Sequence, residues 1–169
     1  DSVLCVRVQA VDSMAQMFEL MVDKRERHLL ALFGDGGVQA ETLELGDVLC
    51  KYQDGSCWVA ERKSTQDFAR SILDGRWDEQ KACLASSGLH IFYILEGDFK
   101  GVEGLPYGAL VGAYTNLLLH QGIATVLRTA NIYETKFVLT QLAQKCQGVA
   151  KPMPLGVVSS KRRKEDDTR

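Results

Sequence analysis

The predicted order of strands and helices places this chain in the α/β class, with a central sheet flanked by helices. Short apolar segments that suit strands alternate with segments that carry apolar residues at helical spacing. The segment 89–95 is apolar almost throughout, which is typical of a strand buried on both faces of a mixed or parallel sheet. With 169 residues, of which 46% are hydrophobic, the chain is long enough for one domain with a sizeable core.

Each predicted element is bounded by residues that turn or cap the chain. Six strands are predicted, at 18–22, 38–45, 48–52, 57–63, 89–95 and 123–127. Helices are predicted at 27–33, 64–74, from about 76 to 85, at 107–120 and at 131–145. Ser64 and Asn131 are the expected N-caps of two of these helices. In the last helix we expect the inward side chains to be Tyr133, Phe137, Val138, Leu142 and Ala143.

Composition argues against several kinds of protein. The formal net charge of -2 gives no global basic field, so a nucleic-acid partner would have to meet a local patch. The five cysteines form no Cys-x-x-Cys pair and the three histidines lack zinc-ligand spacing, which favours a reducing compartment without a structural zinc. No apolar run reaches the roughly 20 residues that a membrane span needs, so we expect a soluble protein.

Three adjacent charged residues, Glu61, Arg62 and Lys63, end an apolar strand where Val or Ile would be usual. Because side chains two apart on a strand share a face, Glu61 and Lys63 point the same way and Arg62 points opposite. The place of Asp47 depends on the hairpin turn. A two-residue loop puts Asp47 opposite Arg62, whereas a three-residue loop or a bulge with Gly55 in the left-handed region puts it opposite Glu61.

Asp23 and Glu26 close the first predicted strand and are expected beside this hairpin. Four converging carboxylates would repel and raise one another's pKa values unless a divalent cation neutralised them. Ligands that are all oxygen suit Mg²⁺, with Mn²⁺ as a substitute. Such an ion would activate a water and stabilise a pentacoordinate phosphate, while Lys63 would orient the water or offset negative charge. This chemistry is phosphodiester hydrolysis.

Simpler interpretations stay open for each residue taken alone. A Glu-Arg-Lys triplet at a strand end is often a solvated edge with surface ion pairs. Asp67 fits the acidic position of a capping box, and Glu26 fits the first turn of a helix. The conjunction favours the nuclease interpretation: Gly46-Asp47, a hairpin, Glu61-x-Lys63, and then a capped helix followed by Arg76, Gln80 and Lys81.

These residues resemble a known family. Gly46-Asp47 followed by 61–67 resembles the GD…ERKxxxD signature of the XPF-type structure-specific endonucleases. The segment 72–81 resembles the corresponding run of the Mus-type catalytic subunit of crossover-junction endonuclease. The similarity continues at 93–97 and 128–135. It covers about residues 18–147, and the paired motifs are specific to that family.

The resemblance implies a restriction-endonuclease-like fold, in which helices flank a central mixed sheet. It implies Mg²⁺-dependent incision of branched DNA, such as 3′ flaps, replication forks and nicked Holliday junctions, in nuclear DNA repair and recombination. It also implies a heterodimer with a non-catalytic Eme-type subunit, in which one face of the segment 107–145 meets the second subunit. The competing interpretations are a non-catalytic DNA-positioning subunit of the same family and a nuclease of this fold that acts on unbranched DNA.

Motif matching also assigns roles to residues. The resemblance implies that Asp47 and Glu61 bind the metal together with the Arg62 carbonyl, and that Asp23 and Glu26 complete the acidic pocket. The resemblance also implies that Lys63 assists the attacking water and that Arg62 contacts the pocket or the DNA backbone. Asp67 would brace the signature helix. The residues implied to contact DNA are Arg76, Gln80 and Lys81.

Three segments are expected along the chain: an N-terminal extension or linker at 1–16, the nuclease domain at 17–148, and a charged linker or tail at 149–169. The basic run at 161–164 fits a solvated linker better than a nuclear-localisation patch. The tandem helix-hairpin-helix module that follows the nuclease domain in the family is missing from this sequence. Because the sequence begins with Asp1, we expect it to be a piece of a longer protein.

Overall fold

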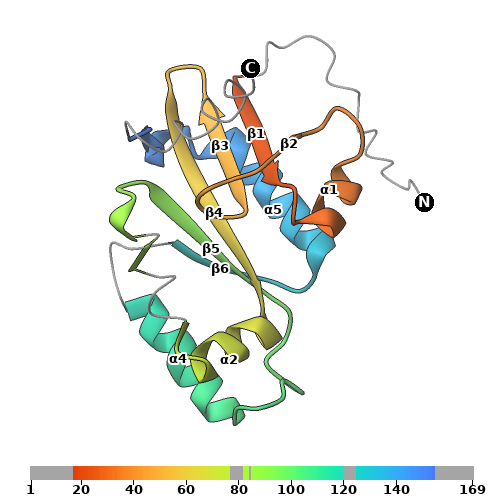
Figure 1. Cartoon of the computed structure of the whole chain (residues 1–169), viewed down its shortest axis with the longest axis vertical. Helices are drawn as coiled ribbons and strands as arrows, with labels where there is room; N and C mark the ends of the chain where they lie inside the picture. Colours follow the sequence, from red (N-terminus) through yellow and green to blue (C-terminus); the bar gives the residue numbers. More distant parts are fainter. Residues whose placement is uncertain (1–16, 77–81, 84, 120–124, 155–169) are drawn as a thin grey trace, which may run out of the picture.

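The computed structural model describes residues 17–76, 82–83, 85–119 and 125–154, and it confirms the α/β architecture. Within these residues a seven-stranded mixed sheet lies at the centre, with helices on both of its faces (Figure 1). The strand order is β2-β1-β3-β4-β5-β6, and β7 pairs with the start of β4. The central strands β4, β5 and β6 are parallel to one another, whereas β3 is antiparallel to both β1 and β4.

Most predicted elements are found within two residues of their predicted ends. The strands are β1 (Phe18–Asp23), β2 (Gln39–Glu41), β3 (Val48–Tyr52), β4 (Ser56–Ser64), β5 (His90–Glu96), β6 (Thr125–Thr129) and β7 (Lys151–Pro152). The helices are α1 (Arg27–Phe33), α2 (Thr65–Leu73), α4 (Tyr107–Leu119) and α5 (Ile132–Lys145), with a 3-10 turn η1 (Gln147–Val149). The helix predicted from about 76 falls largely outside the described residues, as do 1–16 and 155–169.

Both predicted N-caps are confirmed. Ser64 accepts a hydrogen bond from the Asp67 N–H (3.0 Å), and its hydroxyl donates to the Asp67 carboxylate (2.8 Å). Asn131 accepts from the Glu134 N–H at 3.0 Å. These bonds satisfy N–H groups that the first turn of a helix leaves without partners, so α2 and α5 begin where the sequence indicates.

The strand predicted at 38–45 is wrong in its second half. Strand β2 has only three residues and pairs with β1 in parallel. Beyond Glu41 the chain leaves the sheet, because the Leu43 N–H donates to the Asp23 carboxylate (2.8 Å) instead of to a neighbouring strand. The chain then turns through Gly46, whose φ is +70°, and enters β3.

Two apolar layers cover the sheet (Figure 1). Helices α1 and α5 pack on one face, where Leu29 and Leu139 belong to the same core cluster as Trp58 of β4. Helices α2 and α4 pack on the other face, where Phe68 and Leu110 belong to the second core cluster. The sheet therefore separates two cores, and residues that alternate along β4 face one or the other.

The inward orientation predicted for Tyr133 and Phe137 is wrong, since their side chains are 64% and 69% exposed. The buried face of α5 consists of Thr135, Leu139 and Ala143. The Thr135 hydroxyl donates to Glu96 (2.6 Å), which turns this side chain toward the sheet. Residues two positions away on a helix point to the opposite side, so both aromatic rings face outward.

Candidate active site

A row of polar side chains crosses the sheet at one level. The Asp23 N–H donates to the Asp47 carbonyl (2.8 Å), and the Asp47 N–H donates to the Ala60 carbonyl (2.9 Å). The β3–β4 pairing ends at Val48 and Ala60, and the next residues of the two strands are Asp47 and Glu61. They are close enough that, after burial, the charge of Asp47 is the largest effect that raises the pKa of Glu61. Glu61 is paired with Tyr93 of β5. Four successive strands thus bring Asp23, Asp47, Glu61 and Tyr93 into one row.

The turn between β3 and β4 sets this register. Lys51 pairs with Cys57, so the loop centred on 53–55 has three residues, and Gly55 has a φ of +80°. Its N–H donates to the Tyr52 carbonyl at 2.9 Å. Of the two turns that the sequence allowed, the structure has the one that brings Asp47 opposite Glu61.

Asp47 and Glu61 form a pair of half-buried carboxylates. Burial, more than any other effect, raises the pKa of Asp47 to about 6 and that of Glu61 to about 7. Their mutual repulsion adds to the shift at Glu61, and the Arg62 N–H, which donates to Asp47 Oδ2 at 2.9 Å, opposes it at Asp47. Two adjacent carboxylates that resist ionisation are typical of a site that a cation completes.

Lys63 lies on the same face of β4 as Glu61 and is buried. Burial lowers the pKa of its ammonium, while the charge of Glu61 opposes that effect. The prediction that Glu61 and Lys63 share a face is confirmed by the alternation of β4. The arrangement places a cationic side chain beside the carboxylate pair, where negative charge would develop in a hydrolytic reaction.

The side chain of Arg62 lies on the other face of the sheet. It forms two hydrogen bonds with Glu96 (2.8 and 2.6 Å) and one with Glu26 (2.9 Å). Burial disfavours the charged form of Glu96, but hydrogen bonds from Arg62 and Thr135 outweigh burial and lower its pKa. Glu26, predicted as a metal ligand, is therefore engaged in an ion pair with Arg62, although its charge still raises the pKa of Asp47.

Asp23, also predicted as a metal ligand, has both carboxylate oxygens occupied by donors of its own chain. Arg25 donates from its backbone N–H and its side chain, and Leu43 donates from its backbone. The side-chain hydrogen bond from Arg25 is the largest of the effects that lower the pKa of Asp23 to about 2. The roles of Asp23 and Glu26 as metal ligands stay predictions, and the geometry favours Asp47 and Glu61.

The remaining predicted residues lie at the surface or outside the described part. Asp67 accepts a hydrogen bond from Ser64, the N-cap of α2, and its Oδ1 lies 3.4 Å from Arg70 Nη1. Arg76 is exposed and pairs with Asp74 at 2.6 Å. Gln80 and Lys81 lie outside the described residues, so their DNA contacts and that of Arg76 stay predictions.

Sequence reasoning assigned no role to four residues that the structure connects to the site: Arg25, Tyr93, Glu96 and Thr135. The signal for Glu96 was a carboxylate at the end of a buried strand, next to a neighbouring strand that carries Arg62. Tyr93 is buried beside Glu61, and burial followed by the charges of Glu61 and Asp47 raises its pKa. The pairing of β4 with β5 was needed to find both residues, and it is a long-range contact.

The chemistry of the donor set fits one hard divalent cation. Asp47 and Glu61 supply adjacent carboxylates, and a bound cation would remove the repulsion that raises their pKa values. Within the described residues, no group of three or more Asp, Glu, His or Cys side chains surrounds a common point. Two protein carboxylates would suit Mg²⁺, which keeps several waters in its coordination shell.

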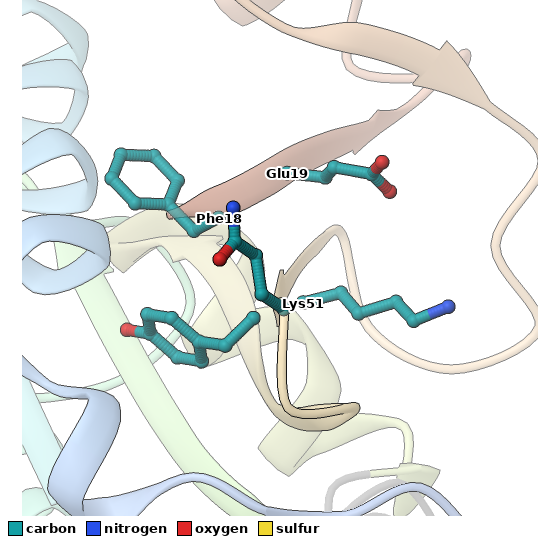
Figure 2. A pocket seen from close by; sticks show the side chains of 5 residues that line it. Phe18, Glu19 and Lys51 are labelled. Atoms are coloured by element: carbon teal, nitrogen blue, oxygen red, sulfur yellow. The ribbon is translucent and has the colours of Figure 1, made fainter. Parts of the chain in front are cut away.

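The described hollows of the surface lie away from this pair. One, of about 310 Å³, is lined by Phe18, Glu19, Lys51, Tyr52 and Gln53, at the ends of β1 and β3 opposite to Asp23 and Asp47. Figure 2 shows Glu19 and Lys51 extending to one side of these strands, while Phe18 extends to the other. None of the described helices is long and apolar enough to cross a membrane.

Comparison with known proteins relates this geometry to one family. The ERCC4 domain family matches residues 22–142. XPF from Aeropyrum pernix superposes with a TM-score of 0.61 and 30% identity, covering 75% of this chain and 63% of that one; the same protein in complex with DNA gives 0.59 and 29%.

Two sequence relatives are much longer than the segment that matches this chain. A Methanocaldococcus jannaschii protein named as an ATP-dependent RNA helicase is 32% identical over 130 residues, which are 76% of this chain and 16% of that protein. The structure-specific endonuclease subunit MUS81 of Homo sapiens is 36% identical over 91 residues, 53% of this chain and 16% of its own length. The chain thus spans a small part of each of these relatives.

Proposed function

Since the chain belongs to the ERCC4 domain family, we propose that it is the nuclease domain of a metal-dependent endonuclease that hydrolyses phosphodiester bonds in branched DNA. The observation that supports this most directly is the nearness of Asp47 to Glu61, with Lys63 on the same face of β4 as Glu61. The likeness to MUS81 and to the XPF–DNA complex supports branched DNA as the substrate, with 3′ flaps, replication forks and nicked Holliday junctions as the structures to test.

Each residue has a role in this proposal. Asp47 and Glu61 would hold Mg²⁺, or Mn²⁺ in its place, and the ion would supply Lewis-acid stabilisation and a water of lowered pKa. Lys63 orients the attacking water or offsets charge that develops on the phosphate. The Arg62 N–H keeps the Asp47 carboxylate aimed along the row, through the 2.9 Å hydrogen bond to Oδ2.

The test is Asp47→Asn, which keeps the shape of the side chain and removes its charge. We expect incision of a 3′-flap duplex with Mg²⁺ to fall by about 1000-fold or more, because the cation loses one of two protein carboxylates. Binding of the same DNA in Ca²⁺ should change less than about threefold. Asp35→Asn, in the exposed 34–37 loop, is the matched control and should cut like the wild type.

Three outcomes would contradict the proposal. Incision by Asp47→Asn near the wild-type rate would remove the carboxylate pair from the chemistry. Wild-type protein that binds branched DNA but never cuts it, with or without Mn²⁺, would favour a DNA-positioning subunit without catalysis. Equal incision of unbranched duplex would favour a nuclease without structure specificity.

We also propose that the protein acts as a Mus-type subunit in a heterodimer with an Eme-type, non-catalytic partner in the nucleus. The surface that supports a partner is the outward face of α5, where Tyr133 and Phe137 are four residues apart and both exposed. Large exposed apolar side chains that lie together mark interaction sites more often than scattered ones do.

Phe137→Asp tests this surface. We expect the variant to lose the partner subunit in co-purification and to sediment as a monomer, because a charge would be buried without a counter-charge. Leu73→Asp, a change of an exposed apolar side chain on α2, is the control and should keep the partner. Retention of the partner by Phe137→Asp would show that this surface is not the subunit interface. Imaging of the tagged protein in cells tests the proposed nuclear location.

A further inference from the structure

The loop between β5 and α4, residues 97–106, forms much of the wall of an open hollow. The hollow has a volume of about 350 Å³, and its lining residues are Phe99, Lys100, Gly101, Val102 and Tyr107. Phe99 belongs to the same core cluster as Val59, which precedes Glu61 by two positions on β4. Because side chains two apart on a strand share a face, the hollow lies on the side of the sheet that carries Glu61 and Lys63, although away from the carboxylate pair itself.

This loop is tied to the start of α2, the helix that directly follows the candidate site (Figure 1). Thr65 Oγ1 donates to the Asp98 carbonyl at 2.9 Å. The Gln66 amide donates to the Glu103 carbonyl and accepts the Glu103 N–H, both at 3.1 Å. Thr65 and Gln66 follow Lys63 by two and three positions, so these hydrogen bonds fix the loop relative to the strand that carries the site.

Tyr107 presents an exposed aromatic ring at this hollow. It is 58% exposed and is the first residue of α4, a helix of 13 residues that fixes its backbone. Phe99, in contrast, is 3% exposed, because its ring packs against those of Phe68 and Tyr114 with centroids 6.3 and 5.8 Å away. The hollow thus has a buried aromatic ring in its wall and a free one on which a flat ligand can stack.

Two cationic side chains lie beside the two rings. Lys100 is exposed and lines the hollow. Arg128 of β6 donates from Nη2 to the Gly97 carbonyl (2.8 Å), and its Cζ lies 4.2 Å from the centroid of the Phe99 ring. The hydrogen bond from the Lys100 N–H is the largest effect that lowers the pKa of Asp98, and the charges of Lys100 and Arg128 add to it. Both cations therefore lie near one carboxylate, and Arg128 is held in place by a ring and a carbonyl.

We propose that this hollow binds one unpaired nucleotide of the branched DNA, with the base stacked on Tyr107 and the adjoining phosphates beside Lys100 and Arg128. The inference rests on the proposed function. Aromatic rings next to cations are the combination by which proteins hold single-stranded nucleic acid without reading its sequence. A base in paired DNA would first have to leave its stack, at a cost in free energy, whereas an unpaired base at a branch is already free. The hollow would thus help to distinguish branched DNA from paired DNA.

The test measures binding of a 3′-flap duplex and of a fully paired duplex of the same length, both in Ca²⁺. We expect Tyr107→Ala to weaken binding of the flap by about tenfold, which is the loss of one stack between a base and an aromatic ring. Binding of the paired duplex should change less than about twofold. Tyr107→Phe should bind the flap like the wild type, because the ring supplies the stacking.

Lys100→Ala tests the phosphate contact. The slope of log affinity for the flap against log salt concentration should become shallower by about 0.7, the value for one phosphate of a single strand. Lys51→Ala is the matched control, since Lys51 is exposed and lines the hollow at the opposite end of β3. It should keep the wild-type affinity and salt slope.

Photo-cross-linking locates the nucleotide. With 5-iodouracil placed in turn at each unpaired position of the flap, we expect one position to cross-link to Tyr107, as identified by mass spectrometry of the digested protein. Tyr107→Ala should lose that cross-link. Thermal unfolding of each variant confirms that the fold is retained.

Three results would overturn the inference. Tyr107→Ala that binds the flap like the wild type would reject the stacking role, and an equal loss for flap and paired duplex would show that the hollow contacts duplex DNA instead. Loss of a protein partner from Tyr107→Ala, with flap binding unchanged, would assign the hollow to that partner. These measurements involve no incision. If Asp47→Asn is inactive while Tyr107→Ala binds the flap normally, this inference alone fails; if Asp47→Asn cuts at the wild-type rate, it is the proposed function that fails.

Discussion

Gly46 allows the chain to enter β3 with Asp47 facing Glu61. Its φ of +70° lies in the left-handed region, and a Cβ added there would stand 2.2 Å from Val59 Cγ1 and 2.9 Å from the Ala60 carbonyl oxygen. The Val59 side chain could rotate away, but the Ala60 carbonyl accepts the Asp47 N–H and is fixed. Both the backbone conformation and the lack of space therefore require glycine beside Asp47.

We predict that Gly46→Ala destabilises the fold by about 2–4 kcal/mol. A left-handed alanine alone costs roughly 1 kcal/mol, and the clash with the Ala60 backbone adds a strain cost of about 1–3 kcal/mol. The measurement is urea unfolding followed by circular dichroism. Gly36→Ala is the matched control, since Gly36 has a φ of +91° with no atom within 4 Å of the added Cβ. Equal losses in the two variants would show that the close approach at Gly46 does not matter.

At the scale of secondary-structure elements, a network that begins at Arg62 joins five of them. The Arg62 backbone belongs to β4, and its guanidinium binds Glu96 at the end of β5 and Glu26 immediately before α1. Glu96 in turn accepts from Thr135 in the first turn of α5, and Thr135 Oγ1 lies 2.7 Å from Thr129 Oγ1 of β6. The network lies under the opposite face of the sheet from Lys63, so it orients the strand that carries the site.

We predict that Glu96→Gln lowers the free energy of unfolding by about 2 kcal/mol. The change removes a charge from a largely buried pair and leaves Arg62 with Glu26 as its remaining ionic partner. Denaturant unfolding measures the loss. Asp74→Asn, which breaks the exposed pair with Arg76, should cost less than about 1 kcal/mol. A loss at Glu96 no larger than that at Asp74 would mean that the network contributes little to stability.

Across the whole molecule, buried acids set the pH dependence of stability. Asp47 and Glu61 have folded-state pKa values of about 6 and about 7, above their ordinary values of 3.8 and 4.5. Between about pH 4 and pH 7 the folded chain therefore holds more protons than the unfolded chain, and the free energy of unfolding falls as pH rises. Asp23, with a pKa of about 2, acts in the other direction: its contribution is present above its ordinary pKa and is lost as pH falls toward 2.

We predict a higher midpoint of thermal unfolding at pH 5 than at pH 8, and a smaller difference in Glu61→Gln, which removes one of the two raised pKa values. Mn²⁺ should raise the midpoint at pH 8 and have much less effect at pH 5, because protons compete with the cation for the same carboxylates. Calorimetry at the two pH values provides the measurement. A midpoint that is equal at both, or a Mn²⁺ effect that Asp47→Asn leaves unchanged, would contradict this account.

Much of the fold and half of the site could be predicted from the sequence. The caps of α2 and α5, the apolar strands and the shared face of Glu61 and Lys63 all depend on residues within a few positions of one another, and such patterns are local. The motifs around Gly46-Asp47 and 61–67 also indicated the family. Because side chains alternate along a strand, a shift of one residue in the turn before Glu61 decides which face Asp47 occupies. The sequence is compatible with both turn lengths and therefore could not predict that face.

The tertiary structure decided what depends on contacts between distant segments. The register of β3 and β4 brought Asp47 to Glu61, and the neighbouring backbone and side-chain donors occupied the Asp23 carboxylate. The pairing of β4 with β5 brought Arg62 within hydrogen-bond distance of Glu96. The hydrogen bond from Thr135 to Glu96 turned one face of α5 toward the sheet, so that Tyr133 and Phe137 point outward. A charged or aromatic residue has the same local pattern whether it binds a ligand, a partner or its own chain. Only the three-dimensional arrangement of donors and acceptors separates these roles.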